Sequence, residues 1–365
     1  MTIHESVSPA ARVADPDEAI SADELHLAAR NHGMPLEALR YDVTPAGLHY
    51  LLIHYDIPWL DPADWRLRID GHVRRPLSLD LDQLRARPQV TTRVTLECAG
   101  NGRARLTPRP VSQPWLDEAV GTAEWTGTPF APLLAEAAPL DGAVDVAFTG
   151  ADHGIERGVE QDYQRGLTIA EAQRPEVLLV HTMNGQPLLP QHGAPLRLLV
   201  PGWYGMAHVK WLVGATVLAE PFAGYQNVTS YRLKQEPDEA GEPVTRISPR
   251  ALIQPPGFPE FQTRTRVVDR GEIELTGRAW SGWGPVERVE VSVDGTTWHD
   301  AHVDEPPAPY AWSAWRWTWP AHTPGRHTLR ARATDATGRT QPVDQAWNRQ
   351  GMANNHAQRL DVVVR

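Results

Sequence analysis

The residue with the most distinctive chemistry is Cys98, the single cysteine among 365 residues. It opens the run Cys-Ala-Gly-Asn-Gly-Arg, which places Gly100, Gly102 and Arg103 directly after it. Glycines let a backbone turn tightly and approach a ligand, and an arginine near the sulfur favours the thiolate. A free cysteine is more often a small buried hydrophobe, but this local sequence favours a metal ligand or a nucleophile.

A second group of chemically active side chains lies between Met183 and Trp211, among glycine and proline turns. Backbone N–H groups in glycine turns bind anions, and arginine binds phosphate through two parallel hydrogen bonds. This region therefore predicts a pocket for a polar anionic ligand. Its cationic and imidazole side chains are His192, Arg197, His208 and Lys210.

Metal-binding motifs with several cysteines or histidines do not occur in the sequence. Neither Cys-x-x-Cys, His-Glu-x-x-His nor the c-haem motif is present, so neither a zinc site nor an attached haem is predicted. One soft thiolate suits a metal whose other ligands come from a cofactor.

Composition excludes some classes of protein. A net charge of −10 gives no basic field for nucleic acid. No stretch approaches the roughly 18 apolar residues of a membrane span, and the N-terminus shows no signal-peptide pattern or arginine pair. With a single cysteine, which fits a reducing compartment, the sequence predicts a soluble cytoplasmic protein that binds neither nucleic acid nor membrane.

The elements that must position these residues divide into an N-terminal extension, residues 1–45, and two domains. The catalytic domain, residues 46–250, mixes strands and helices without regular βαβ alternation, which predicts an α+β fold. The run 94–96 ends a strand just before Cys98. Further strands are predicted at 177–181 and 196–200, and helices at 79–87 and 129–137.

The C-terminal domain, residues 251–365, has an all-β pattern. Alternating valines precede an Asp294-Gly295 hairpin turn, and Trp298 opens the return strand. Three tryptophans at 315, 317 and 319 share one strand face, typical of a sandwich core or an oligomer interface. We predict an immunoglobulin-like sandwich.

Taken together, these motifs resemble the sulfite oxidase family of molybdenum enzymes. The resemblance covers about residues 46–365 in family order. It implies one molybdopterin per chain, no haem in this chain, an external electron carrier such as a cytochrome, and a dimerisation domain that makes the protein a homodimer. It rests on the run at 98–103, the run at 183–211, Gly277-Arg-Ala-Trp-Ser-Gly282 and Trp347-Asn348.

The resemblance also implies roles for individual residues. Cys98 would be the protein ligand to molybdenum, while Arg103 and Tyr231 would polarise the reacting oxygen or bound anion. Trp115 matches a tryptophan of the substrate pocket. The positions that would hold the pterin and its phosphate are His54, Asp152, His192, Arg197, His208 and Lys210.

Two departures from the family concern the substrate. Sulfite-oxidising relatives have arginines where this chain has Leu52 and Gln350, with Arg349 one position early. Losing one charge-assisted contact costs about 1.5–3 kcal/mol, or about 10- to 150-fold in affinity. The resemblance thus implies oxygen-atom transfer to or from a small substrate, as in sulfite oxidation. A sulfoxide or other S- or N-oxide reductase is the alternative, and a cysteine-nucleophile hydrolase or an inactive family member are less favoured ones.

Overall fold

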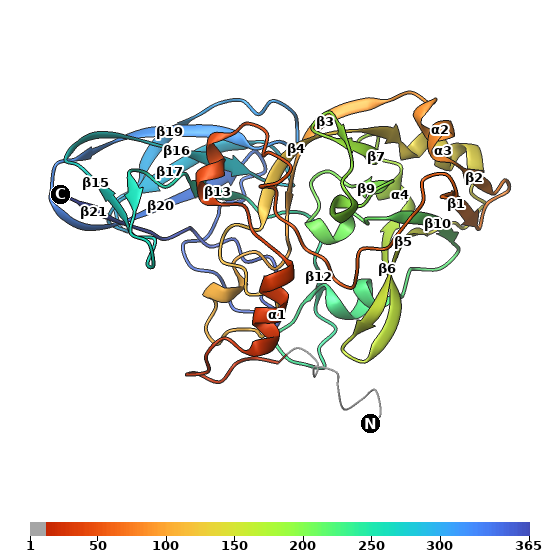
Figure 1. Cartoon of the computed structure of the whole chain (residues 1–365), viewed down its shortest axis with the longest axis horizontal. Helices are drawn as coiled ribbons and strands as arrows, with labels where there is room; N and C mark the ends of the chain where they lie inside the picture. The colour runs from red at the N-terminus through yellow and green to blue at the C-terminus, as the bar shows by residue number, and fades with distance from the viewer. Residues whose placement is uncertain (1–11) are drawn as a thin grey trace.

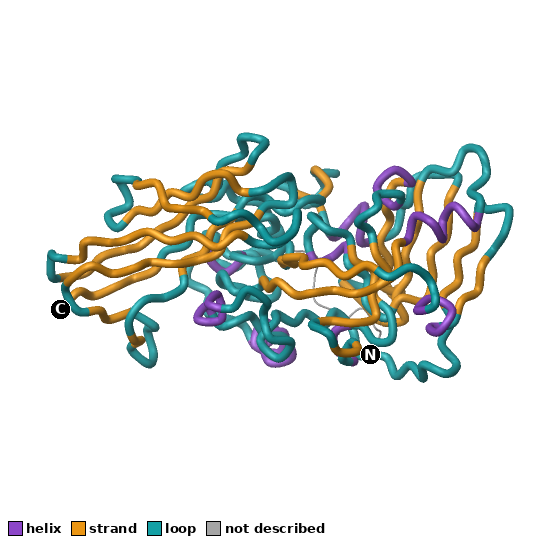
Figure 2. The backbone as a smooth tube through the Cα atoms, turned by 90° about the horizontal axis from the view of Figure 1, so that it is seen from above, coloured by secondary structure: helices purple, strands orange, loops and turns teal. Residues whose placement is uncertain are grey.

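The computed structural model describes residues 12–365 and consists mostly of strands arranged in two lobes (Figure 1). Figure 2 shows that strands dominate both lobes and that helical segments are short. The predicted α+β class therefore overstates the helical part of the catalytic lobe, because short apolar runs rarely distinguish buried strands from helices. The α-helices are α1 (Ala22–Arg30), α2 (Leu81–Arg85), α3 (Phe130–Ala137) and α4 (Ile169–Ala172).

The N-terminal lobe is built on two sheets. The first has the order β2-β1-β10-β5-β6, with β1 and β10 parallel and the other neighbours antiparallel. The second has the order β3-β4-β7-β8, and β9 also pairs with β7. The first sheet comprises β1 (Leu67–Gly71), β2 (Leu77–Leu79), β5 (Asp145–Glu156), β6 (Val159–Thr168) and β10 (Leu212–Leu218). The second comprises β3 (Val90–Glu97), β4 (Val120–Pro129), β7 (Leu178–Met183), β8 (Gln186–Pro187) and β9 (Arg197–Leu199).

Both predicted helices of the catalytic lobe form, at slightly shorter bounds. A capping box joins Asp80 and Gln83 at the start of α2, which satisfies backbone donors that the first turn leaves free. Helix α3 buries Phe130, Leu133 and Leu134 completely. The strands predicted at 177–181 and 196–200 form as β7 and β9.

The C-terminal lobe is a single nine-stranded sheet that folds over on itself. Its order is β13-β16-β19-β18-β17-β20-β21-β15-β14, and β13 packs across against β20. Of the three predicted tryptophans, Trp315 and Trp319 lie buried between the layers, as the core alternative predicts, whereas Trp317 is only partly buried at the edge of this cluster. The strands are β13 (Arg250–Ile253), β14 (Phe258–Pro259), β15 (Arg266–Val268), β16 (Gly271–Trp280), β17 (Val286–Ser292), β18 (His299–Val303), β19 (Ser313–Ala321), β20 (Gly325–Asp335) and β21 (Leu360–Val364). A small ribbon, β11 (Arg232–Leu233) with β12 (Glu242–Pro243), precedes them.

The two lobes share buried side chains. Trp280 and Trp312 of the C-terminal lobe belong to the same apolar core as the N-terminal sheets. Arg250, which has no exposed surface, donates to Glu97 Oε1 at 3.0 Å and to Asp117 Oδ1 at 2.8 Å. Because Glu97 is the last residue of β3, Arg250 connects the C-terminal lobe directly to the strand that precedes the Cys98 turn.

The N-terminal extension wraps the molecule as far as the structure describes it. Met34 and Leu39 are buried in the core, and His32 pairs with Leu51 through two backbone hydrogen bonds. The start of the extension, residues 1–11, lies outside the described residues. No helix in the described part of the chain is long and apolar enough to cross a bilayer.

Candidate active site

The Cys98 turn follows β3 directly. The Asn101 N–H donates to the Cys98 carbonyl at 3.0 Å, and the Gly100 N–H points at Sγ at 3.4 Å. Gly102 adopts φ +87°, a left-handed conformation that favours glycine. A Cβ on Gly100 would lie 2.7 Å from Nη2 of Arg103. The glycine therefore lets the guanidinium pack against the turn beside the sulfur.

Burial opposes ionisation of the Cys98 thiol. Only 7% of the residue is exposed, and burial raises the pKa of the thiol although the Arg103 charge lowers it. The prediction that Arg103 favours the thiolate is right in direction, but desolvation outweighs it. No hydrogen bond within residues 12–365 joins Cys98 Sγ to a histidine, so the base that a nucleophilic cysteine needs is missing from this arrangement.

Arg103 is a buried cation held by carbonyl groups. Its Nε donates to the Gln350 carbonyl at 2.7 Å and its Nη1 to the Gln113 carbonyl at 3.3 Å. Burial lowers the pKa of its guanidinium, while Cys98 and the Tyr231 phenol raise it. No carboxylate among residues 12–365 forms an ion pair with it, which leaves its charge available to an anionic group near Cys98.

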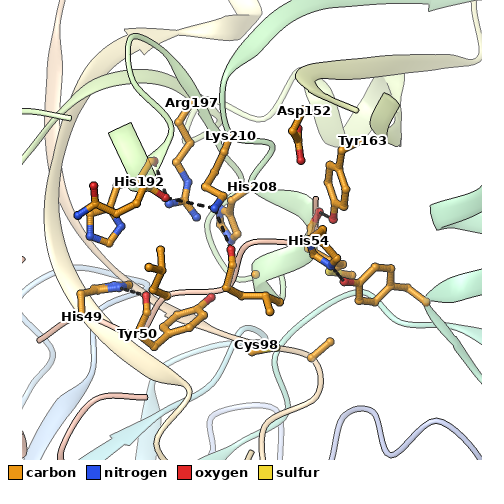
Figure 3. Close-up of a pocket in the computed structure, with 17 residues that line it drawn as sticks. His49, Tyr50, His54, Cys98, Asp152, Tyr163, His192, Arg197, His208 and Lys210 are labelled. Atoms are coloured by element: carbon orange, nitrogen blue, oxygen red, sulfur yellow. Dashed lines mark hydrogen bonds between the residues drawn. The ribbon is translucent and has the colours of Figure 1, made fainter. Parts of the chain in front are cut away.

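A cavity extends from Cys98 to the second group of residues (Figure 3). The open space between its walls, counted together with the solvent at its mouth, is about 620 Å³. Eight of the ten sequence-predicted site residues line it, whereas Arg103 and Trp115 are buried close to Cys98 and are not among the lining residues. The eight are His54, Cys98, Asp152, His192, Arg197, His208, Lys210 and Tyr231. Sequence reasoning missed the lining residues His49, Tyr50 and Tyr163.

Two cations gather at the end of the cavity away from Cys98 (Figure 3). Arg197 leaves its buried Nε without a partner, and Lys210 Nζ donates to the carbonyls of Leu52 and Gln191. Burial lowers the pKa of Arg197 to about 10 and that of Lys210 to about 7. Neither forms an ion pair with a carboxylate of the described residues. Uncompensated buried cations require an anionic ligand, such as a phosphate.

Asp152 lies in the same wall as these cations. Its buried Oδ1 has no hydrogen-bond partner. Burial raises the pKa of the carboxyl group to about 6, although the Lys210 charge lowers it. A carboxyl with that pKa can accept from, or when protonated donate to, a polar ligand in the cavity.

The histidines of the cavity are held neutral by burial. The pKa of His192 falls to about 4 and that of His208 to about 3, in each case chiefly through desolvation. His208 Nδ1 accepts from the Val200 N–H, and its Nε2 lies 3.1 Å from the Trp203 carbonyl. Both ring nitrogens of His208 are thus engaged by backbone, so this side chain offers the ligand its ring face and carbon edge rather than a nitrogen.

A tyrosine–histidine pair forms the side of the cavity. Tyr231 follows a π-helical turn at Gln226–Ser230, and its hydroxyl lies 2.9 Å from His54 Nε2. Burial raises the pKa of Tyr231 well above its usual range and lowers that of His54 to about 4. At neutral pH a protonated phenol therefore faces a neutral imidazole, and the imidazole tautomer decides which of the two donates. Arg165 stacks over the Tyr231 ring at 5.6 Å.

Trp115 and Leu52 complete the surroundings of the sulfur. Trp115 packs in the same buried cluster as Cys98, with its Nε1 unpartnered. Leu52 lines the cavity. Gln350 is buried behind Arg103, and its Oε1 also lacks a partner.

The donor set fits a molybdopterin cofactor. The sulfur of Cys98 lies at one end of the cavity. The cations of Arg197 and Lys210, which form no ion pair within residues 12–365, lie at the other end. The sulfur suits molybdenum, and the cations suit the phosphate of the pterin. The buried polar atoms left without partners, Arg197 Nε and Asp152 Oδ1, are atoms that such a ligand would satisfy.

Comparisons with known proteins agree with this chemistry. Residues 54–226 match the family described as oxidoreductase molybdopterin binding domain, and residues 257–365 match the Mo-co oxidoreductase dimerisation domain. Mitochondrial sulfite oxidase of Mus musculus is 33% identical over 99% of this chain and 70% of that protein. Nitrate reductase [NADH] 2 of Phaseolus vulgaris is 29% identical over 94% of this chain and 43% of that protein.

Among solved structures, the sulfane dehydrogenase SoxCD from Paracoccus pantotrophus superposes with a TM-score of 0.78. It is 25% identical, and the match covers 97% of this chain and 92% of that one. Fold, site and similarities together define an enzyme of the molybdopterin-dependent oxidoreductase class. Within this class, the chain belongs to the sulfite oxidase family.

Proposed function

We propose that this enzyme oxidises a small sulfur compound that carries less negative charge than sulfite. The observation that supports this most directly is Leu52, an apolar side chain in the cavity wall where sulfite-oxidising relatives have arginine. Arg103 then supplies the guanidinium beside Cys98, and two of its nitrogens already serve carbonyl groups. Only the Nη2 nitrogen of Arg103 is then left without a carbonyl partner, and it suits a single anionic oxygen better than a dianion.

The roles of the chain's own side chains follow from their positions. Cys98 would bind the metal, and the cationic pair Arg197 and Lys210 would hold the phosphate end of the cofactor. When bound, the cofactor supplies the two-electron couple and the oxygen-atom transfer. Arg103 orients an anionic oxygen of the substrate, and the Tyr231 hydroxyl holds a proton close to the same space. Most of these side chains are buried, which strengthens both interactions.

The SoxCD similarity supports a sulfur substrate, because that protein acts as a sulfane dehydrogenase. The similarity to sulfite oxidases leaves sulfite itself as the first compound to test. Reduction of a sulfoxide or another S- or N-oxide is the second candidate, since Leu52 favours an uncharged substrate in that direction as well.

Steady-state assays separate these substrates. Sulfite and less charged sulfur compounds would be compared with ferricyanide as the acceptor, and sulfoxides with a reduced dye as the donor. We expect weak sulfite turnover in the wild type. We expect Leu52→Arg to raise kcat/KM for sulfite by about 10- to 150-fold, the value of one charge-assisted contact. Efficient wild-type sulfite oxidation that Leu52→Arg leaves unchanged would refute the proposal.

The proposal includes partners, architecture and location. The dimerisation-domain match supports a homodimer, and the folded-over C-terminal sheet supports an immunoglobulin-like sandwich. We propose that a separate one-electron carrier, such as a cytochrome, receives the electrons singly and that the enzyme works in the cytoplasm. Light scattering of the purified enzyme, reduction of added cytochrome c and cell fractionation test these points.

A further inference from the structure

Asn31 lies at the end of α1, in the N-terminal segment that precedes both family matches. Only 5% of it is exposed. Its side-chain amide uses both of its polar atoms in contacts with segments far away in sequence. Oδ1 accepts from the Ile53 N–H at 2.7 Å, and Nδ2 donates to Gln113 Oε1 at 2.9 Å.

The first of these contacts fixes one wall of the cavity. Ile53 stands between Leu52 and His54, and both of these line the cavity. The Leu52 carbonyl accepts from Lys210, and His54 pairs with Tyr231. The hydrogen bond that Asn31 accepts therefore anchors the backbone between these two residues, beside the bonds that Lys210 donates to the Leu52 carbonyl and Arg30 to the His54 carbonyl.

The second contact, between Asn31 and Gln113, connects Asn31 to Arg103. Gln113, which is 6% exposed, receives the Asn31 amide through its side chain, and its backbone carbonyl accepts from Arg103 Nη1 at 3.3 Å. Asn31 is thus hydrogen-bonded on one side to the cavity wall that carries Leu52, and on the other side to Gln113, whose carbonyl binds Arg103. The neighbouring His32 pairs with Leu51 and Met34 with Glu118, which hold the bridge in place from the same segment.

We propose that Asn31 is a positioning residue that sets the spacing between Arg103 and the Leu52–His54 wall. The N-terminal segment is then part of the substrate site although it touches no substrate. This inference rests on the proposed function for the identity of the site. It does not depend on which sulfur compound is oxidised.

Two substitutions at Asn31 and one control separate positioning from general stability. Asn31→Leu keeps the size of the side chain but leaves the Ile53 N–H and Gln113 Oε1 unpaired. Asn31→Asp keeps the acceptor for Ile53, and the Gln113 amide can rotate to donate to the second oxygen. Glu24→Gln removes the ion pair that buried Glu24 of the same segment forms with Arg109. The hydrogen bonds described for the Arg109 side chain reach only Glu18, Ala19 and Glu24, none of which lines the cavity.

The experiment uses the purified holoenzyme and three measurements. Amide hydrogen exchange of residues 50–54 reports the first contact. The electron paramagnetic resonance spectrum of the partly reduced enzyme reports the surroundings of the metal. With the best substrate from the assays above, we expect kcat/KM of Asn31→Leu to fall by about 10- to 100-fold, as small misplacements do. Asn31→Asp should recover most of this loss.

The expected pattern is faster exchange at 50–54 and an altered spectrum in Asn31→Leu, with both unchanged in Glu24→Gln even if that variant melts earlier. Unchanged exchange and spectrum in Asn31→Leu would overturn the positioning role. Exchange and spectral changes in an enzyme that oxidises none of the sulfur compounds would support the positioning role while refuting the proposed function, so the two failures are distinguishable.

Discussion

Replacing Lys210 should have opposite effects on the protein without its cofactor and on the protein that holds it. Lys210 is one of only two lysines in the chain, and the other is Lys234. Its ammonium group faces the cavity without a carboxylate partner, and burial lowers its pKa from 10.5 to about 7. We predict that Lys210→Met stabilises the cofactor-free protein and weakens cofactor retention.

The magnitude follows from the lowered pKa. A fall from 10.5 to about 7, at about 1.4 kcal/mol per tenfold change in the proton equilibrium, makes the buried charge cost about 5 kcal/mol in acid. Replacement by methionine also leaves the Leu52 and Gln191 carbonyls unpaired, at about 1 kcal/mol each. The cofactor-free variant should therefore be more stable than the wild type by about 1–3 kcal/mol.

The pH dependence has a definite sign. Between pH 7 and about 10 the unfolded state binds the Lys210 proton more tightly than the folded state, so stability of the cofactor-free wild type rises with pH. The advantage of Lys210→Met is complete below about pH 7 and falls as the pH rises. Near pH 10 only the two unpaired carbonyls remain, so the variant should be less stable than the wild type by about 2 kcal/mol. Urea unfolding at several pH values, on protein from a host that cannot make the cofactor, measures this.

With the cofactor bound, the order should reverse. Loss of one charge-assisted contact to a phosphate costs about 1.5–3 kcal/mol, or about 10- to 150-fold in affinity. Molybdenum and pterin retained after long dialysis measure this loss, with Lys234→Met as the matched control. If cofactor-free Lys210→Met is less stable than the wild type at pH 6, or retains cofactor equally well, the anion-binding role of this end of the cavity is wrong.

Three further substitutions test other parts of the site. Cys98→Ser should fold normally but lose sulfur-to-metal absorption and at least about 100-fold in activity, because a hydroxyl is a harder ligand than a thiolate; a fully active Cys98→Ser enzyme would contradict metal ligation. Gly100→Ala should displace Arg103, whose Nη2 would lie 2.7 Å from the new Cβ, and lower kcat/KM by about 10- to 100-fold. Gly47→Ala, where no atom lies within 4 Å of the new Cβ, is its control and should be neutral. Arg250→Met should lower the free energy of unfolding by about 3–5 kcal/mol, because the buried Glu97 loses its cation and Asp117 keeps only the pair with Arg105. Chemical denaturation measures it, and a loss below about 1 kcal/mol would mean that the network contributes little.

Much of the site could be predicted because its chemistry lies in short local runs. The turn after Cys98 and the group around Arg197 carry their own glycines and charges, and the structure brings them to one cavity. The period-two pattern also predicted the burial of Trp315 and Trp319, because alternation reports which strand face is covered. Trp317 shares the pattern but is only partly buried. The return strand starts at His299, one residue after the predicted Trp298.

Other features depend on contacts between distant segments and leave no local pattern. His49 lines the cavity because the segment before Leu51 runs along it, and Tyr163 does so from strand β6. Only His49 left a weak sequence signal, as a polar residue five positions before His54. The bridge made by Asn31 joins residues 22 and 82 positions away. Burial reversed the expected state of the Cys98 thiol, because desolvation depends on the whole surrounding fold.

The buried contacts of Arg250 limit how the two lobes can be exchanged between related proteins. The guanidinium on one lobe neutralises Glu97 and Asp117 on the other, and Trp280 Nε1 also donates to Glu97. A chimera that takes its C-terminal lobe from a relative without this arginine and tryptophan would leave Glu97, directly before Cys98, buried without its counter-charge, and Asp117 with only its pair to Arg105. We therefore expect the two lobes to unfold together, and a change at their contact reaches Cys98, the proposed metal ligand, through Glu97.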